Sequence, residues 1–157
     1  MVATESIQVE RVKQSRISQV DFADLPFGKI YTDHMFMADY RDGEWKNLRV
    51  VPYGHISISP ATPALHYGQS IFEGVKAYKN IHGEVAIFRP KDNNKRFNIS
   101  AERLAMPHVP EEIFICLSLL FLRAFILEIK SFFILCDLVL DELNKTAILT
   151  EFDKFLL

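Results

Sequence analysis

The strongest constraint on the fold is an abrupt loss of turn-forming residues near residue 112. All six glycines lie at or before Gly83, all seven prolines at or before Pro110, and all five histidines at or before His108. Glycine and proline supply the backbone angles that tight turns require. A stretch without them is either continuous helix or a sequence not shaped to fold. Residues 113–157 are therefore predicted to form an atypical apolar tail of helical structure.

Three interpretations compete for the apolar run Ile113–Cys136 within this tail. A membrane-spanning helix needs ~20 predominantly apolar residues. Arg123, Glu128 and Lys130 interrupt the run, and each such charge costs roughly 2.5–3.5 kcal/mol at the centre of a membrane. A buried or amphipathic helix avoids that cost. The joint disappearance of glycine, proline and histidine favours the third interpretation, in which the tail is the product of a frameshift or a read-through junction.

Composition sets the class of protein. The 157 residues suffice for one ordinary domain, and 49% hydrophobic against 24% charged residues is a globular balance. A net charge of −2 excludes the electrostatic footprint of a nucleic-acid-binding protein. Two cysteines, Cys116 and Cys136, are too few for a disulfide framework, and no cluster of ligands predicts a metal site. The first residues lack the apolar segment of a secretory signal, which predicts a cytoplasmic protein.

The first two thirds of the chain read as short strands followed by one helix. A hairpin is expected where Val75–Tyr78 and Val85–Phe88 flank the turn signal at 80–83. Between Lys91 and Met106, apolar residues recur at helical spacing without glycine or proline. The order of elements predicts an α+β fold with an antiparallel sheet. Three further strands are expected at Ile30–Met37, Leu48–Val51 and His55–Ile58.

Polar side chains form one stripe on the expected helix, at Asn93, Arg96, Ser100 and Arg103. Such a stripe is commonly a solvated face. Alternatively, it is an anion site, because a guanidinium near a helix N-terminus adds bidentate hydrogen bonds to the helix dipole. The spacing alone favours the solvated face.

Three other groups of residues are weaker candidates. Asp33 and His34 are neighbours on a strand and point to opposite faces, which disfavours a shared metal or a catalytic pair. Tyr67 and Phe72 either pack a core or line an apolar pocket. Lys76 stands between apolar residues, where a lowered pKa would allow Schiff-base chemistry. A strand lysine that extends its amine to water is the more common arrangement.

Taken together and in order, three motifs resemble those of branched-chain amino acid aminotransferases, a fold-type IV pyridoxal-phosphate family. The resemblance covers roughly residues 20–114. The motifs are Phe27-Gly28-(x)3-Thr32-Asp33-His34-Met35, Ala64-Leu65-His66-Tyr67-(x)4-Phe72-Glu73-Gly74-Val75-Lys76-Ala77-Tyr78, and Phe88-Arg89-Pro90-(x)2-Asn93-(x)2-Arg96-(x)3-Ser100-Ala101-(x)1-Arg103-Leu104-(x)1-Met106-Pro107.

The resemblance implies roles for individual residues. Arg96 matches the arginine that binds the phosphate of pyridoxal 5′-phosphate (PLP), whereas Phe27, Tyr67 and Phe72 match aromatic residues that line the pocket for a branched side chain. Lys76 does not match the Schiff-base lysine, which belongs to a Lys-x-x-Gly-Asn-Tyr segment of the family's second domain. This chain contains no such segment, and the family's Tyr-x-Arg-Pro strand is also missing after residue 112. We therefore assign no catalytic residue.

The expected organisation is an N-terminal extension over 1–20, the small aminotransferase domain over 21–112 and the tail over 113–157, without the lysine-bearing domain. By family, the reaction converts leucine, isoleucine or valine and 2-oxoglutarate to a branched 2-oxo acid and glutamate, with PLP as cofactor and a homodimer as the assembly. This chain alone is expected to be truncated and inactive. The alternative is a non-catalytic remnant or a membrane-associated protein built from one such domain. D-amino acid aminotransferases and aminodeoxychorismate lyases fit the Thr-Asp-His-Met and Leu-His-Tyr motifs less well.

Overall fold

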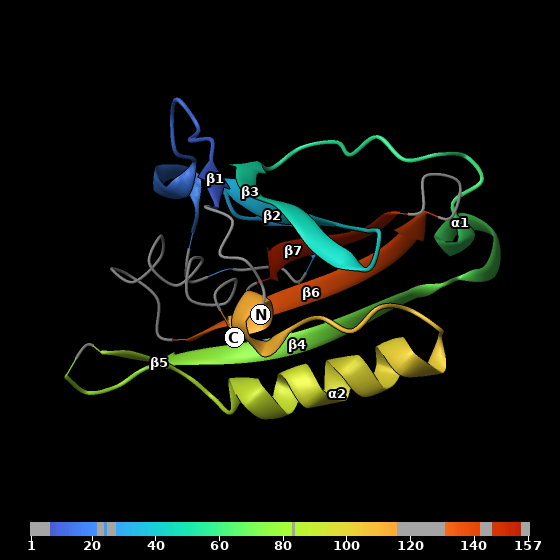
Figure 1. Ribbon diagram of the computed structural model, residues 1–157. Coiled ribbons are helices and arrows are strands. Elements are labelled where there is room, and N and C mark those ends of the chain that lie inside the picture. Colours follow the sequence, from blue (N-terminus) through green and yellow to red (C-terminus); the bar gives the residue numbers. More distant parts are fainter. Residues whose placement is uncertain are drawn as a thin grey trace.

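The computed structural model describes residues 7–21, 24, 28–82, 84–115, 131–141 and 146–154. They form one mixed sheet with helices beside it, so the α+β expectation holds for this part of the chain (Figure 1). The strand order is β1-β3-β2-β7-β6-β4-β5, and every pairing in it is antiparallel except β1 with β3. The elements are β1 (Gln8–Val9), η1 (Ile17–Gln19), β2 (His34–Arg41), β3 (Glu44–Pro52), α1 (Pro63–Tyr67), β4 (Ser70–Lys79), β5 (Val85–Ile87), α2 (Pro90–Arg103), β6 (Ser131–Asp141) and β7 (Thr146–Lys154).

Both hairpins of the first two thirds are set by their turn residues. Asp42 and Gly43 have φ of 55° and 83° between β2 and β3, and positive φ at both central residues matches the twist of paired strands. In the second hairpin the side-chain oxygen of Asn80 accepts hydrogen bonds from the backbone N–H groups of His82 and Glu84, both at 2.9 Å. The predicted β4–β5 hairpin is therefore confirmed.

The other predicted strands are confirmed only in part. The segment Leu48–Val51 lies within β3, whereas the strand expected at Ile30–Met37 begins at His34 and continues to Arg41. The strand expected at His55–Ile58 is wrong, since residues 54–59 have no regular secondary structure. Apolar alternation over so short a segment does not by itself provide a neighbouring strand to pair with.

The prediction of a helical tail is wrong for the described residues beyond 130. β6 pairs with β4 from Ser131 to Val139 and with β7 from Phe133 to Asp141, so it lies inside the sheet. A short apolar run does not distinguish a buried strand from a buried helix, and strand pairing decides between them. Residues 116–130 lie outside the described residues, and 111–115 are helical. No helix in the described part of the chain is long and apolar enough to span a membrane.

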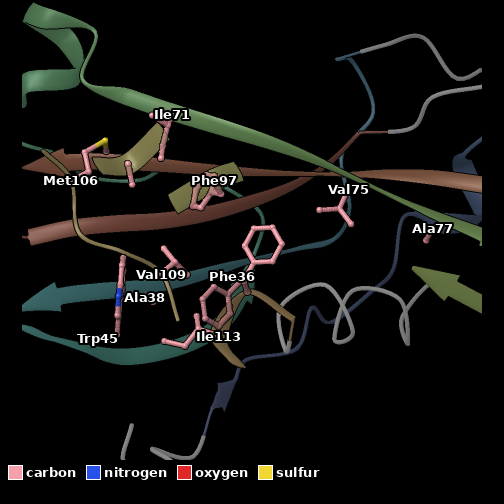
Figure 2. Packing of buried hydrophobic residues seen from close by; sticks show 12 residues of the cluster. Phe36, Ala38, Trp45, Ile71, Val75, Ala77, Phe97, Met106, Val109 and Ile113 are labelled. Atoms are coloured by element: carbon pink, nitrogen blue, oxygen red, sulfur yellow. The ribbon is translucent and has the colours of Figure 1, made fainter. Parts of the chain in front are cut away.

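The hydrophobic core lies where α2 and the segment after it cover the sheet. Phe97 and Ala101 of α2, both without solvent exposure, share a cluster with Ile71 and Val75 of β4. Figure 2 shows side chains from β2, β3 and the chain after α2 meeting the same cluster. The observed helix, Pro90–Arg103, is shorter than the predicted Lys91–Met106 but has the expected apolar face. Because this apolar face packs against the sheet, it fixes the rotation of the helix about its axis. The polar stripe consequently lies beside β4.

The N-terminal segment is attached to the start of β2 by two residues that the sequence singled out. Asp33 accepts hydrogen bonds from the backbone N–H of Arg16 at 3.1 and 3.3 Å, and from its Nε at 3.1 Å. The Nε2 atom of His34 accepts the backbone N–H of Val12 at 3.1 Å. Asp33 and His34 thus bind different residues of the preceding chain.

Acid is expected to release the Arg16 attachment. Burial of Asp33 on its own raises the pKa of the carboxyl, but hydrogen bonds from Ser15 and Arg16 and the charge of Arg16 lower that pKa below its usual 3.8. A lowered folded-state pKa means that the stabilisation is complete above pH 3.8 and is lost as the pH falls through the lowered value. An NMR titration of the Arg16 backbone amide should show a midpoint below 3.8, and Asp33→Asn should abolish it. A midpoint at or above 3.8 contradicts the prediction.

Candidate functional site

A cleft of about 780 Å³ opens between β4 and α2. β4 pairs with β6 from Ser70 to Tyr78 but with β5 only from Ala77 to Lys79. The cleft lies beside the part of β4 that precedes its pairing with β5, and its walls come from β4, from the residues that follow β5 and from α2. Figure 1 shows α2 running alongside β4.

The polar stripe of α2 faces the cleft. Asn93, Arg96 and Ser100 all line it, because steps of three and four residues place side chains on one side of a helix. The Ser100 hydroxyl donates to the backbone oxygen of Arg96 at 3.2 Å. Arg103 is exposed in the last turn and does not line the cleft. Three of the four predicted stripe residues are therefore brought together in one wall.

Arg96 forms a two-point ion pair with Glu73. The Nε of Arg96 donates to Oε2 of Glu73 at 2.7 Å, and Nη2 donates to Oε1. The side chain of Glu73 is only 4% exposed, whereas that of Arg96 is 68% exposed. The hydrogen bonds that Arg96 donates to Glu73, and then the negative charge of Glu73, raise the pKa of Arg96. The guanidinium is therefore a permanent cation that is anchored at one edge and open to solvent over much of its surface.

The remaining charges of the cleft come from Lys76, Arg89 and Asp92. The Nε of Arg89 donates to Asp92 at 2.7 Å, which closes a second ion pair at the start of α2. Arg89 has φ of 50°, a left-handed conformation that is uncommon for residues with a side chain. With Arg96 and Glu73 included, the walls hold three cations and two carboxylates. The cleft thus has a net positive charge, which favours an anionic ligand.

The aromatic residues expected to form one pocket are only partly placed there. Phe72 lines the cleft and is 72% exposed. Tyr67, at the end of α1, is 87% exposed and is not among the cleft residues. Phe27 lies outside the described residues. Phe88, just after β5, supplies a second ring, to which the sequence reasoning had given no role.

Glu73 is the main site residue that sequence reasoning missed. Its side chain lies on the buried side of β4 with Ile71 and Val75, whereas Phe72 and Lys76 point the other way. The sequence could have indicated this role. In the strand Ile71-Phe72-Glu73-Gly74-Val75, alternation places Glu73 on the same face as Ile71 and Val75, and a carboxylate on an apolar face requires a buried partner. In the described part of the chain, no group of three or more His, Cys, Asp or Glu residues is arranged to hold a metal ion.

Solved structures of known proteins share this fold. Branched-chain amino acid aminotransferase from Thermobaculum terrenum (M4 mutant) superposes with a TM-score of 0.61 at 17% identity, over 80% of this chain and 39% of that one. The branched-chain aminotransferase of the thermophilic archaeon Thermoproteus uzoniensis, solved with norvaline, superposes with a TM-score of 0.54 at 22% identity, over 74% of this chain and 39% of that one. The fold is therefore that of part of an aminotransferase.

Sequence comparison is more specific. The probable branched-chain-amino-acid aminotransferase of Staphylococcus aureus (strain N315) is 50% identical over 109 residues, which are 69% of this chain and 30% of that protein. The branched-chain-amino-acid aminotransferase of Mycolicibacterium smegmatis is 53% identical over 90 residues, which are 57% of this chain and 24% of that protein. No family model matches the chain. Over about 70% of its length, this chain is homologous to the branched-chain amino acid aminotransferases, and it spans less than a third of the curated relatives it matches.

Proposed function

We propose that residues 21–112 form the small-domain wall of a PLP-dependent branched-chain amino acid aminotransferase, in which Arg96 binds the phosphate of the cofactor. The exposed guanidinium in a positively charged cleft is the observation that carries this proposal. An anion site is compatible with many reactions. The homology to branched-chain aminotransferases favours transamination. The role is that of one wall, because this chain contains no Lys-x-x-Gly-Asn-Tyr segment.

The residues of the cleft fit a phosphate group. An arginine has five N–H donors, and the Glu73 pair occupies two of them. The others remain on the Nη atoms, where bidentate binding of phosphate oxygens is favourable. Ser100 lines the same wall, with its hydroxyl proton donated to the backbone oxygen of Arg96. Lys76 adds a positive charge that no ion pair within the described residues neutralises.

The proposed substrates are leucine, isoleucine and valine, with 2-oxoglutarate as amino acceptor. Bound PLP supplies the electron sink that transamination requires. In this chain, Phe72 provides an apolar surface in the cleft that Arg96 also lines, and Phe27 and Tyr67 would complete the pocket for the branched side chain. Tyr67 does not line the cleft of this chain. Its role in the substrate pocket would therefore require an additional protein surface that brings Tyr67 and the substrate together. A homodimer of the complete enzyme is the proposed source of that surface.

Binding of pyridoxamine 5′-phosphate tests the proposal. This compound has no aldehyde and therefore cannot react with surface lysines. Pyridoxamine, which lacks the phosphate, is the control compound. Calorimetric titration should show tighter binding of the phosphorylated compound. Arg96→Ala should weaken that binding roughly 10–100-fold, as expected for hydrogen bonds between charged groups. In the same samples supplied with PLP, leucine and 2-oxoglutarate should yield no glutamate above the blank, because the Schiff-base lysine segment is missing.

Arg103→Ala is the matched control, since it removes the same charge from the same helix outside the cleft. If Arg96→Ala and Arg103→Ala weaken the binding of pyridoxamine 5′-phosphate equally, the compound is attracted only by the overall positive charge. That result would contradict the assignment of Arg96 as the phosphate-binding residue. Equal affinity of the wild-type chain for pyridoxamine and its phosphate would do the same. Glutamate formation above the blank would refute the expected inactivity of this chain alone.

A further inference from the structure

Glu73 is a buried acid whose contacts all converge on the wall of the cleft. Its side chain is 4% exposed, and burial of an unpaired carboxylate is strongly unfavourable. Besides the two bonds from Arg96, it accepts the backbone N–H of Gly74 at 3.0 Å and the side-chain amide of Asn93 at 3.1 Å, both on Oε1. Both oxygens are therefore held by named donors.

Asn93 makes this anchor rigid. Its amide nitrogen lies 3.1 Å from Oε1 of Glu73 and 3.0 Å from the backbone oxygen of Gly74. The same side chain thus bridges the first turn of α2 to β4. The carboxylate that contacts Arg96 is consequently fixed by both elements that form the walls of the cleft.

Arg96 gains most from such an anchor. A largely exposed arginine side chain samples many rotamers in solution, and an anion that binds it must restrict that motion. The contacts through Nε and Nη2 fix the plane of the guanidinium before any ligand arrives. Covalent geometry then leaves one proton of Nη1 and the second proton of Nη2 at the adjacent edge of the guanidinium.

We propose that Glu73 is a positioning residue: it holds one edge of the Arg96 guanidinium so that the other edge is preorganised for an anionic phosphate. This inference rests on the proposed function of Arg96. An opposing electrostatic effect is also expected, because the negative charge of the Glu73 carboxylate repels an anion in the cleft. The two effects have opposite signs when the charge of Glu73 is removed. Preorganisation predicts weaker phosphate binding, whereas simple competition for Arg96 predicts tighter binding.

Glu73→Gln and Glu73→Asp separate these effects, with inorganic phosphate and pyridoxamine 5′-phosphate as probes. The glutamine variant loses the charge and cannot accept at both positions, and the aspartate variant keeps the charge but withdraws it from Arg96. Both should bind the probes roughly 10-fold more weakly, because a fixed donor set loses less entropy on binding. Glu102→Gln, an exposed acid on the same helix, should change affinity less than about 2-fold. In an Arg96→Lys background, Glu73→Gln should have little further effect, since lysine cannot form the two-point pair.

The NMR signal of the Arg96 Nε–H reports positioning without any ligand. It should exchange slowly with water in the wild-type chain and rapidly in Glu73→Gln, while urea denaturation verifies that the variant is folded. Tighter phosphate binding by Glu73→Gln, or an Nε–H signal independent of Glu73, would overturn the inference even if Arg96 binds phosphate. A Glu73-dependent signal with no response of the wild-type chain to either probe would instead refute the proposed function and leave the Glu73–Arg96 clamp established.

Discussion

Replacing Phe97 by alanine is expected to lower the free energy of unfolding by about 3–5 kcal/mol. The ring is completely buried between α2 and β4, and its centroid lies 5.7 Å from that of Phe114. Its removal leaves a cavity at the contact that joins the helix to the sheet. Urea denaturation followed by circular dichroism measures the effect. A loss of this size would also disturb the position of Arg96 in the cleft, because Arg96 lies on the same helix.

Ile99→Ala provides the comparison for this variant. Ile99 lies on the same helix but is 56% exposed, so its truncation should cost less than about 1 kcal/mol. Similar losses in Phe97→Ala and Ile99→Ala would mean that α2 does not cover the core through Phe97. Phe97→Leu should fall between wild type and Phe97→Ala, since most of the apolar volume is retained.

Asn98→Asp is expected to destabilise the chain by about 2–3 kcal/mol at neutral pH. The side chain of Asn98 accepts the backbone N–H of Val109 at 2.8 Å and donates to its carbonyl oxygen at 2.9 Å. Aspartate keeps the shape but places a charged oxygen against that carbonyl. Because Val109 is fully buried, the carbonyl keeps only the donor from the side chain of Asn94 at 3.1 Å. The segment after α2 should then detach more easily, as measured by urea denaturation and amide exchange of Val109.

Acidification is a control within the same variant. A protonated aspartic acid regains a donor for the carbonyl of Val109, so the difference from wild type should shrink as the pH falls below the ordinary aspartate pKa of about 4. A difference that is independent of pH would point to altered packing rather than to the lost hydrogen bond.

Local signals in the sequence were sufficient for particular elements. The β4–β5 hairpin was predictable because Asn80 and its neighbours satisfy the turn by themselves. The α2 helix was predictable because Phe97 and Ala101 recur at the helical period, and the same period places Asn93, Arg96 and Ser100 on one side. These features depend on residues that are near one another in the chain. The strand expected at His55–Ile58 failed because a strand also requires a partner.

The site depends on contacts between distant residues. The acid at position 73 and the arginine at position 96 were both visible, but the sequence does not state which arginine reaches which acid. The tail illustrates the same limit, since the pairing of β6 with β4 joins residues far apart in the chain, and the apolar run itself was compatible with helix.

The hairpin, the helix and the polar stripe were predictable from the amino-acid sequence alone, because short-range backbone geometry and side-chain periodicity specify them. The homology rests on the sequence alone as well. Three features became visible only in the folded chain: β6 and β7 lie within the sheet, Tyr67 does not line the cleft, and Glu73 holds Arg96 at the wall of the cleft. A strand or a buried charge pairs with whichever partner the folded chain brings beside it, and these partners are distant in sequence.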